Sequence, residues 1–224
     1  MPRIVAWSEA DGPVDGFADR LRAEHPGETV DVQEGPLAVA LLDAGATVGR
    51  RSLLMGLDPL PESLDPGTFA GAVGPMRTEP GRYAGALLHA FPPDHPDYDP
   101  EIPDLAGAER ALASYFSGAV IGPFLDQASS EATDPGGRVV GGIVIGRMPH
   151  DESSPGGPWV TEVFVEPDAQ GTGVGRALFA RAVAELRTAG EPSLRLAVQI
   201  DNPARHLYTR LGFATTSAWS RITL

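Results

Sequence analysis

The stretch VFVEPDAQGTGVGRALFARAV, residues 163–183, joins an apolar segment to an amphipathic one through three glycines at alternate positions. The apolar segment Val163–Val165 is typical of a buried strand. Beyond the glycines, apolar residues recur at every fourth position and predict a helix with one buried face: Val174, Leu178, Ala182 and Leu186. The stretch therefore predicts a strand, a loop of almost bare backbone, and a helix.

The three glycines, Gly171, Gly173 and Gly175, favour a loop that holds a phosphate. One glycine is enough for a turn, whereas several let an anion approach the backbone closely because no Cβ intervenes. The first N–H groups of the following helix have no partners within the helix, and the helix dipole attracts negative charge to them. We therefore expect this loop to bind phosphate groups.

Two common phosphate-binding motifs are excluded. The dinucleotide motif G-x-G-x-x-G requires a small residue at the position where Arg176 stands. The P-loop of nucleoside triphosphatases requires a lysine, and all 17 basic residues of this chain are arginine. The absence of lysine also excludes Schiff-base chemistry, which needs a lysine amine.

The overall composition narrows the function further. A net charge of −13 argues against a nucleic acid, whose binding depends on neutralising phosphates, and favours a cationic partner such as an amine. The absence of cysteine excludes disulfides, thiolate metal ligands and a cysteine nucleophile. No apolar run approaches the roughly 20 residues that cross a bilayer, and the N-terminal sequence lacks a secretory signal. We expect a cytoplasmic protein without membrane contact.

The pattern along the chain predicts a mixed α/β fold. Before the quoted stretch it predicts a strand, two helices and a hairpin: Thr68–Thr78, Pro80–Ala90, Leu105–Phe116, Ala128–Thr133 and Arg138–Arg147. The Pro-rich segments 91–104 and His150–Pro158 predict loops, the second one leading into a strand over Trp159–Val165. After the quoted stretch come a strand, a short helix and a closing strand: Leu194–Ile200, Asn202–Gly212 and Ala214–Leu224.

Two motifs resemble one family. The segment from Val165 through Pro167 and Gln170 to Gly175 is similar to the Q/R-x-x-G-x-G/A signature that binds acetyl-CoA in the GNAT superfamily of N-acetyltransferases. A second segment, Asn202–Phe213, begins 27 residues after Gly175 and is similar to the family element N-x-x-A-x-x-L-Y-x-x-x-G-F. It fits that element from Ala204 to Phe213, but one residue instead of two separates Asn202 from Ala204. The resemblance covers roughly residues 68–224. It implies the GNAT fold, a central mixed, mostly antiparallel sheet flanked by helices.

The resemblance also implies how acetyl-CoA is held. Backbone amides of the glycine loop would bind the pyrophosphate: Gln170, Gly171, Thr172, Gly173 and Gly175. Arg176 would add positive charge there, unless it is an ordinary exposed helix residue. The strand through Phe164 and Val165 would bond the pantetheine arm as an added strand does. Asn202 would contact the same arm, and it is also suited to cap its helix.

The family mechanism is a direct attack of a neutral amine on the thioester carbonyl. Tyr208 matches the general acid of the motif, because a phenol with a pKa near 10 can hydrogen-bond or protonate the departing thiolate. Glu162 is the candidate general base, acting directly or through water, or else an ordinary solvated carboxylate of its strand. Glu162 and Phe164 share one face of the strand, so an inward glutamate requires that face to open. Thr161 lies on the other face and is a candidate for a proton relay.

Other polar residues are weaker candidates. His206 stands two residues before Tyr208, on a different helix face, and is expected to be exposed. His95 lies in an acidic loop with Asp94, Asp97, Tyr98 and Asp99, which is expected to be solvated or to receive a cationic amine. No spacing of residues resembles a metal site.

The first 58 residues resemble a truncated second copy of the C-terminal half. At an offset of 167, Pro36 matches Pro203, Gly45 matches Gly212 and Leu57 matches Leu224. This copy lacks the glycine loop, with Gly35 in place of Asn202 and Leu41 in place of Tyr208, so it cannot run the same chemistry. We expect a degenerate segment 1–58, a linker 59–67 and a catalytic domain 68–224; chance similarity of two short β-α-β segments is the alternative. A fragment this small should dock on the catalytic domain or on a partner subunit, which leaves a homodimer open.

The leading interpretation is an acetyl-CoA-dependent N-acetyltransferase that modifies a primary amine of a small molecule or a peptide. A non-catalytic acyl-CoA-binding or regulatory GNAT domain is the alternative from another class, and transfer of a longer acyl group is a narrower one. Intact Tyr208 and an intact glycine loop favour the enzyme. Neither the acceptor nor the preferred acyl chain is specified by these residues.

Overall fold

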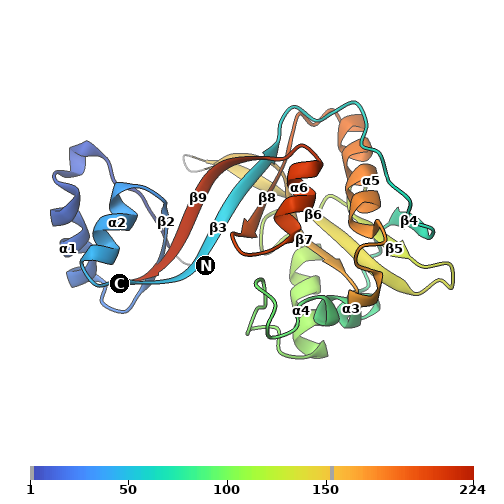
Figure 1. The fold of residues 1–224 in the computed structure, drawn as a ribbon, viewed down its shortest axis with the longest axis horizontal. Coiled ribbons are helices and arrows are strands. Elements are labelled where there is room, and N and C mark those ends of the chain that lie inside the picture. Colours follow the sequence, from blue (N-terminus) through green and yellow to red (C-terminus); the bar gives the residue numbers. More distant parts are fainter. Residues whose placement is uncertain (1–2, 152–153) are drawn as a thin grey trace. The chain divides into compact units, whose positions relative to one another are not determined.

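The structure, a computed structural model, describes residues 3–151 and 154–224 (Figure 1). Within these residues it has six α-helices and a mixed, mostly antiparallel sheet of nine strands. Across the sheet the strands follow the order β1-β2-β9-β3-β8-β7-β6-β5-β4. This arrangement confirms the mixed α/β class.

The helices are α1 (Val14–Glu24), α2 (Pro36–Asp43), α3 (Ala84–Ala90), α4 (Leu105–Phe116), α5 (Val174–Thr188) and α6 (Ala204–Arg210). The strands are β1 (Arg3–Val5), β2 (Thr29–Gln33), β3 (Thr47–Leu57), β4 (Ala72–Pro75), β5 (Ser130–Thr133), β6 (Val139–Asp151), β7 (Ser154–Val165), β8 (Leu194–Gln199) and β9 (Ala214–Thr223). From β4 to β9 the order of strands and helices is the one that the sequence predicts.

The chain divides into two compact units. Unit 1 contains the residues up to Met55 together with Ala197–Arg205 and Ala214–Leu224. Unit 2 contains Gly56–Leu196 and His206–Phe213. The two units group the chain by compactness, and the domain boundaries expected from the sequence stay a prediction.

In unit 2 the helices cover both faces of the sheet. Gly141 and Gly142 are neighbours on β6, so their Cα–H bonds point to opposite faces. A Cβ on Gly141 would meet the side chain of Val174 on α5, whereas a Cβ on Gly142 would meet Phe164 and Met76. Phe164 and Met76 belong to a buried cluster. The cluster also contains Tyr83 and Leu87 of the α3 segment, and Ala108 and Leu112 of α4. The segment α3–α4 and helix α5 therefore lie on opposite faces.

The longest hairpin differs from the prediction. Residues His150–Pro158 were expected to form a loop, but His150 pairs with Pro155 and Arg147 pairs with Pro158, in antiparallel register. The prediction was wrong because it read the prolines and glycines of this segment as loop signals, whereas pairing along β6 keeps the chain extended. Glu152 and Ser153, within that expected loop, lie outside the described residues.

A bulge in this hairpin lies next to the candidate base. Val144 pairs with Glu162 and Ile145 pairs with Val160, so Thr161 is an extra residue on β7. A bulge bends its strand and re-aims the side chains around it. Glu162 and Phe164 follow the bulge on the face that α3 and α4 cover.

Unit 1 has its own core. The antiparallel pairing of β2 with β9 runs from Thr29–Thr223 to Gln33–Trp219, and β1 adds in parallel beside β2. The buried cluster draws on both ends of the chain, since Ile222 of β9 packs with Val30, Val32 and Leu41. The helix, strand, helix and strand that the N-terminal repeat predicts are α1, β2, α2 and β3.

The expected linker is irregular but attached. Residues 59–67 contain no helix or strand. Leu60 is buried, its N–H donates to the carbonyl of Pro192 at 2.9 Å, and its carbonyl accepts from Arg187 at 3.2 Å. The segment is therefore bound along unit 2 rather than extended as a free tether.

Candidate active site

The glycine loop is open and partly left-handed at the start of α5. Gly171 and Gly173 adopt φ angles of +78° and +98°, in the left-handed region that favours glycine. Residues Gln170–Thr172 are exposed, and Gly173 is the N-cap of α5. The first N–H groups of α5 lack partners within the helix, and such groups beside an exposed loop are suited to bind an anion.

The three glycines have different roles. Nothing lies within 4 Å of the position that a Cβ would take on Gly171, so the space above it is open. At Gly173 a Cβ would approach the backbone nitrogen of Phe69 to 3.3 Å. At Gly175 it would approach Leu207 of α6 to 3.0 Å, so this glycine permits close packing of α5 on α6. Of the three, Gly171 best fits a direct approach by a phosphate.

Two expected contacts of the cofactor already have partners within the protein. Arg176 donates from its guanidinium to the backbone carbonyl and the carboxylate of Asp65, both at 2.8 Å. The side-chain amide of Gln170 donates to the carbonyl of Val165 at 3.3 Å, and the backbone N–H of Gln170 donates to Pro167 at 3.3 Å. A bound phosphate or pantetheine would have to replace these contacts or accept from other groups.

Phe164 and Val165, the other residues expected to bind the pantetheine arm, lie at the end of β7. Phe164 is 1% exposed, so its side chain belongs to the core and only its backbone is suited to bind a ligand. β7 pairs with β8 in parallel at Trp159 and Arg195. The expected bonds between this strand and the pantetheine arm stay a prediction.

Asn202 is buried in unit 1 and acts as a cap. Its side-chain oxygen accepts from the N–H of Ala204 at 2.8 Å at the start of α6. This is the capping role expected of it, whereas its contact with the cofactor is untested. Thr161 is half-buried, and its Oγ1 lies 3.1 Å from the position of a Cβ on Gly146.

Tyr208 combines burial with an unused hydroxyl. The residue is 5% exposed and its ring packs edge-on against Phe179, with centroids 5.6 Å apart. Among the described residues its hydroxyl has no hydrogen-bond partner. Burial, with the negative charges of Asp97 and Glu162, raises the pKa of Tyr208 above its ordinary value. The phenol is therefore protonated at neutral pH and ready to donate.

One residue of the candidate site was not predicted from the sequence. Tyr115, in the last turn of α4, donates its hydroxyl to Oε2 of Glu162 at 3.4 Å. Burial first, then the charges of Glu162 and Asp99, raise the pKa of Tyr115. Tyr115 belongs to the helix predicted over Leu105–Phe116, and a buried tyrosine hydroxyl usually needs a polar partner. This need for a polar partner was the signal in the sequence that could have identified Tyr115.

The loop 91–104 brings acidic groups to both tyrosines. Asp97 acts electrostatically on Tyr208, and Asp99 acts on Tyr115. His95 accepts the N–H of Asp97 at 3.0 Å and so stabilises the loop. His206 is exposed, as expected. These carboxylates therefore bring negative charge close to both phenols.

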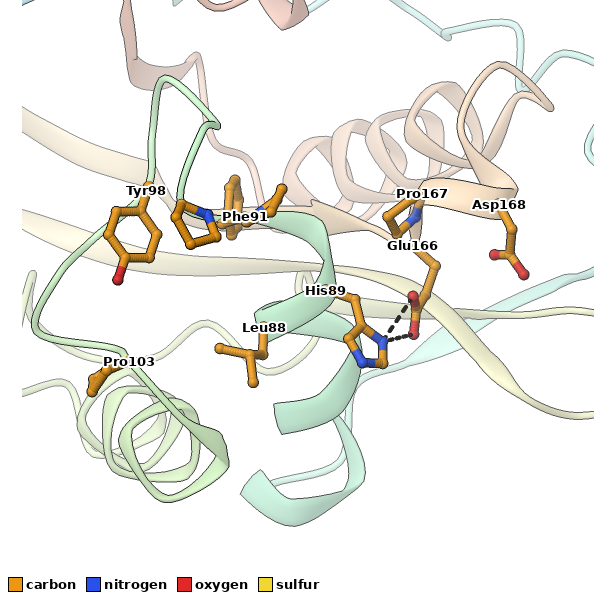
Figure 2. A pocket seen from close by; sticks show the side chains of 10 residues that line it. Leu88, His89, Phe91, Tyr98, Pro103, Glu166, Pro167 and Asp168 are labelled. Atoms are coloured by element: carbon orange, nitrogen blue, oxygen red, sulfur yellow. Dashed lines mark hydrogen bonds and ion pairs between the residues drawn. The ribbon is translucent and has the colours of Figure 1, made fainter.

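A groove of about 620 Å³ lies between the end of α3, the loop 91–104 and the segment that follows β7 (Figure 2). Figure 2 shows His89 and Glu166 pointing toward each other, with the ring nitrogen 3.2 and 3.3 Å from the two carboxylate oxygens. The other lining residues are mostly apolar: Leu88, Phe91, Pro92, Pro93, Tyr98, Pro103, Pro167 and Asp168. Its size falls within the range of small-molecule sites.

Among the residues whose side chains the structure describes, no group of His, Asp and Glu is arranged to hold a metal ion. Every helix in the described part of the chain is too short or too polar to cross a lipid bilayer.

Comparison with known proteins identifies the family. Residues 87–213 match the family described as Acetyltransferase (GNAT) family. The chain belongs to this family. The match includes α4, β7, the glycine loop and α5. It therefore covers both the residues expected to bind acetyl-CoA and the candidate catalytic residues Glu162 and Tyr208.

Individual relatives agree with this assignment. A mycothiol acetyltransferase from Cellulomonas flavigena is 37% identical over 101 residues, which cover 42% of this chain and 29% of that protein. Matched segments thus span less than a third of the length of such curated relatives.

Solved structures show the same fold. A GCN5-related N-acetyltransferase from Sphaerobacter thermophilus has a TM-score of 0.60 and 19% identity, covering 91% of this chain and 62% of that one. A tandem GNAT protein from the clavulanic acid biosynthesis pathway has a TM-score of 0.59 and 14% identity, covering 94% and 67%. At these identities the likeness concerns the fold alone.

Proposed function

We propose that this protein is an N-acetyltransferase that transfers the acetyl group of acetyl-CoA to a primary amine. The observation that carries the proposal is an exposed glycine loop at the N-terminus of helix α5, in a chain of the GNAT family. In this loop Gly171 is left-handed, and no atom lies within 4 Å of the position that its Cβ would take. Such a loop fits the pyrophosphate of coenzyme A, because anions bind to unpaired helical N–H groups.

The proposed reaction is a direct transfer. The amine nitrogen attacks the thioester carbonyl carbon, a C–N bond forms, and the C–S bond breaks to release the thiolate of coenzyme A. The amine must first lose a proton. With a pKa near 10.4, an ammonium at pH 7 is about 4 to 5 kcal/mol from its neutral form. Glu162 accepts this proton, directly or through water.

Tyr208 acts on the leaving thiolate. A thiol has a pKa of about 8.5, below that of any ordinary phenol, so full transfer of the phenolic proton to sulfur is unfavourable. The raised pKa of Tyr208 widens that difference. We therefore assign Tyr208 a hydrogen bond to sulfur that stabilises the developing charge, with final protonation by solvent.

The acceptor is proposed only as a class. Asp97, Asp99 and Glu162 favour a cationic amine, and the apolar groove beside His89 is the candidate position for the body of such a molecule. Because relatives are named mycothiol acetyltransferases, an amine precursor of mycothiol is one acceptor to test.

The test separates binding from turnover. Calorimetry with acetyl-CoA and with coenzyme A measures donor binding. Release of free thiol is then followed with a panel that contains the mycothiol precursor, phenethylamine, cadaverine, glucosamine and a peptide with a free N-terminus. Thiol release that requires an amine supports the proposal. Tight donor binding without turnover on any acceptor would instead indicate a non-catalytic acyl-CoA-binding domain.

A further inference from the structure

Glu162 is held at both of its carboxylate oxygens. Tyr115 of α4 donates to Oε2 at 3.4 Å, and the N–H of Val163 donates to Oε1 at 3.1 Å. Each carboxylate oxygen can accept more than one hydrogen bond, so the group is still able to receive a proton from an amine. The carboxylate is thus fixed in orientation by one donor from a helix and one from its own strand.

The charge of this carboxylate acts on two tyrosines of different helices. Tyr115 comes from α4 and Tyr208 from α6, and the charge of Glu162 acts on both. The loop 91–104 adds Asp99 near Tyr115 and Asp97 near Tyr208. Two carboxylates thus act electrostatically on each phenol, and of the two hydroxyls only that of Tyr115 donates to one of these carboxylates in the described part of the chain.

We propose that Tyr115 is a positioning residue that orients Glu162 and keeps it ionised as the base of the reaction. This inference rests on the proposed function. A hydrogen bond donated to a carboxylate favours the ionised form, which opposes the effect of nearby negative charges. The distance of 3.4 Å is long for a hydroxyl donor, and such contacts often tighten when substrate binds.

The variant Tyr115→Phe tests this role through the pH dependence of the rate. Removal of one hydrogen bond to a charged group is expected to move the acidic limb of kcat/KM for the amine up by about one pH unit. At pH values below the limb, kcat/KM of the variant is about tenfold lower than that of the wild type. At high pH the two values become equal. The affinity for acetyl-CoA stays unchanged. A purely structural role would lower the rate by the same factor at every pH.

A matched control is Tyr83→Phe. Tyr83 is also a buried tyrosine that donates to a carboxylate, to Glu131 at 2.6 Å, but it has no bond to Glu162. This variant is expected to lower the melting temperature at least as much as Tyr115→Phe and to leave the acidic limb in place. An acidic limb that moves equally in both variants would overturn the assignment to Tyr115.

A second measurement does not depend on activity. Titration of the Glu162 side-chain carbon by NMR, assigned with Glu162→Gln, follows its ionisation directly in the protein without ligand. Its midpoint should rise in Tyr115→Phe and stay fixed in Tyr83→Phe. A midpoint that does not move overturns the hydrogen-bond role, even where the enzyme is active. If the NMR midpoint moves but no panel amine is acetylated, the proposed function fails, and with it the catalytic meaning of the contact.

Discussion

Three buried or partly buried tyrosines of unit 2 differ chiefly in what their hydroxyls contact. Tyr83 donates to Glu131 at 2.6 Å and accepts from the N–H of Arg77 at 2.7 Å, so its hydroxyl belongs to the framework. Tyr115 makes one long contact, and Tyr208 makes none among the described residues. The sequence places all three within apolar patterns. Only the three-dimensional partners separate a structural phenol from one that is free to act on a ligand.

The variant Tyr208→Phe tests the unused hydroxyl. We expect kcat to fall about a hundredfold, because a positioned donor to the leaving group contributes on that order. The free energy of unfolding should change by less than about 1 kcal/mol, since no hydrogen bond is broken within the protein. Thiol release, calorimetry with acetyl-CoA and thermal melting measure the three quantities. An unchanged kcat would remove Tyr208 from the mechanism.

Glu131 gives a prediction about stability and pH. Arg82 donates to it twice, at 2.7 and 2.8 Å, and these bonds lower the pKa of Glu131. A carboxylate with a lowered folded pKa contributes stability above its unfolded pKa of about 4.3, and this stability is lost as pH falls through the folded pKa. We expect Glu131→Gln to cost about 2 to 3 kcal/mol at pH 7 and progressively less below pH 4.

Denaturant unfolding at several pH values measures this difference. Glu185→Gln is the control, because Glu185 forms a partly buried i,i+4 pair with Arg181 on one helix, and such helix pairs contribute about 0.3 to 0.5 kcal/mol. If the cost of Glu131→Gln were the same at pH 3 and pH 7, its ionised form would not be what stabilises the fold.

At the scale of elements, local signals predicted most boundaries. Helix α4 begins and ends where expected. Its start is fixed by Asp104, which caps the helix by accepting the N–H of Gly107 at 2.7 Å. The strand expected at Thr68–Thr78 is reduced to Ala72–Pro75, and the hairpin β6–β7 is longer than expected. Both errors concern strands, whose length is decided by a partner that local patterns do not reveal. The glycine loop was predicted correctly as a loop before a helix, whereas the pairing of Arg176 with Asp65, far away in sequence, was not.

The two ends of α5 offer a matched pair of glycines. Gly171 before the helix and Gly190 after it both have a φ of +78°, and neither has an atom within 4 Å of its would-be Cβ. Alanine at either position should therefore cost a similar amount of stability, about 1 kcal/mol, from backbone strain alone. Only Gly171→Ala should weaken acetyl-CoA binding, by about tenfold, because its Cβ enters the space proposed for the pyrophosphate. Calorimetry and thermal melting of both variants measure this, and equal affinities would place the phosphate elsewhere.

At the scale of the whole chain, the N-terminal repeat and the C-terminal half complete each other within unit 1. β2 pairs with β9, and the N–H of Glu34 donates to the carbonyl of Ala218 at 2.8 Å. In the other direction, the N–H of Ile200 donates to the carbonyl of Arg51 at 3.1 Å. Arg51 and Ala218 are 167 residues apart, the same offset that relates the two sequence segments. The resemblance of the two halves was readable from the sequence, but their mutual pairing was not, because the pairing depends on contacts between distant residues.

This reciprocity predicts that the expected catalytic domain does not reach full stability alone. Without residues 1–58, β9 loses β2 and the ion pair between Arg221 and Asp31, and the fully buried Ile222 becomes exposed. Exposing one isoleucine and an open strand edge costs several kcal/mol and favours aggregation. We expect the fragment 59–224 to melt at least about 10 °C below the full chain or to self-associate, with recovery on co-expression of residues 1–58.

Removing only residues 1–6, which takes away the edge strand β1, should have a much smaller effect, because β2 and β9 remain paired. Calorimetry with size-exclusion chromatography compares the three chains, and a fragment 59–224 that is monomeric with the melting temperature of the full chain would show that β9 does not need the N-terminal segment.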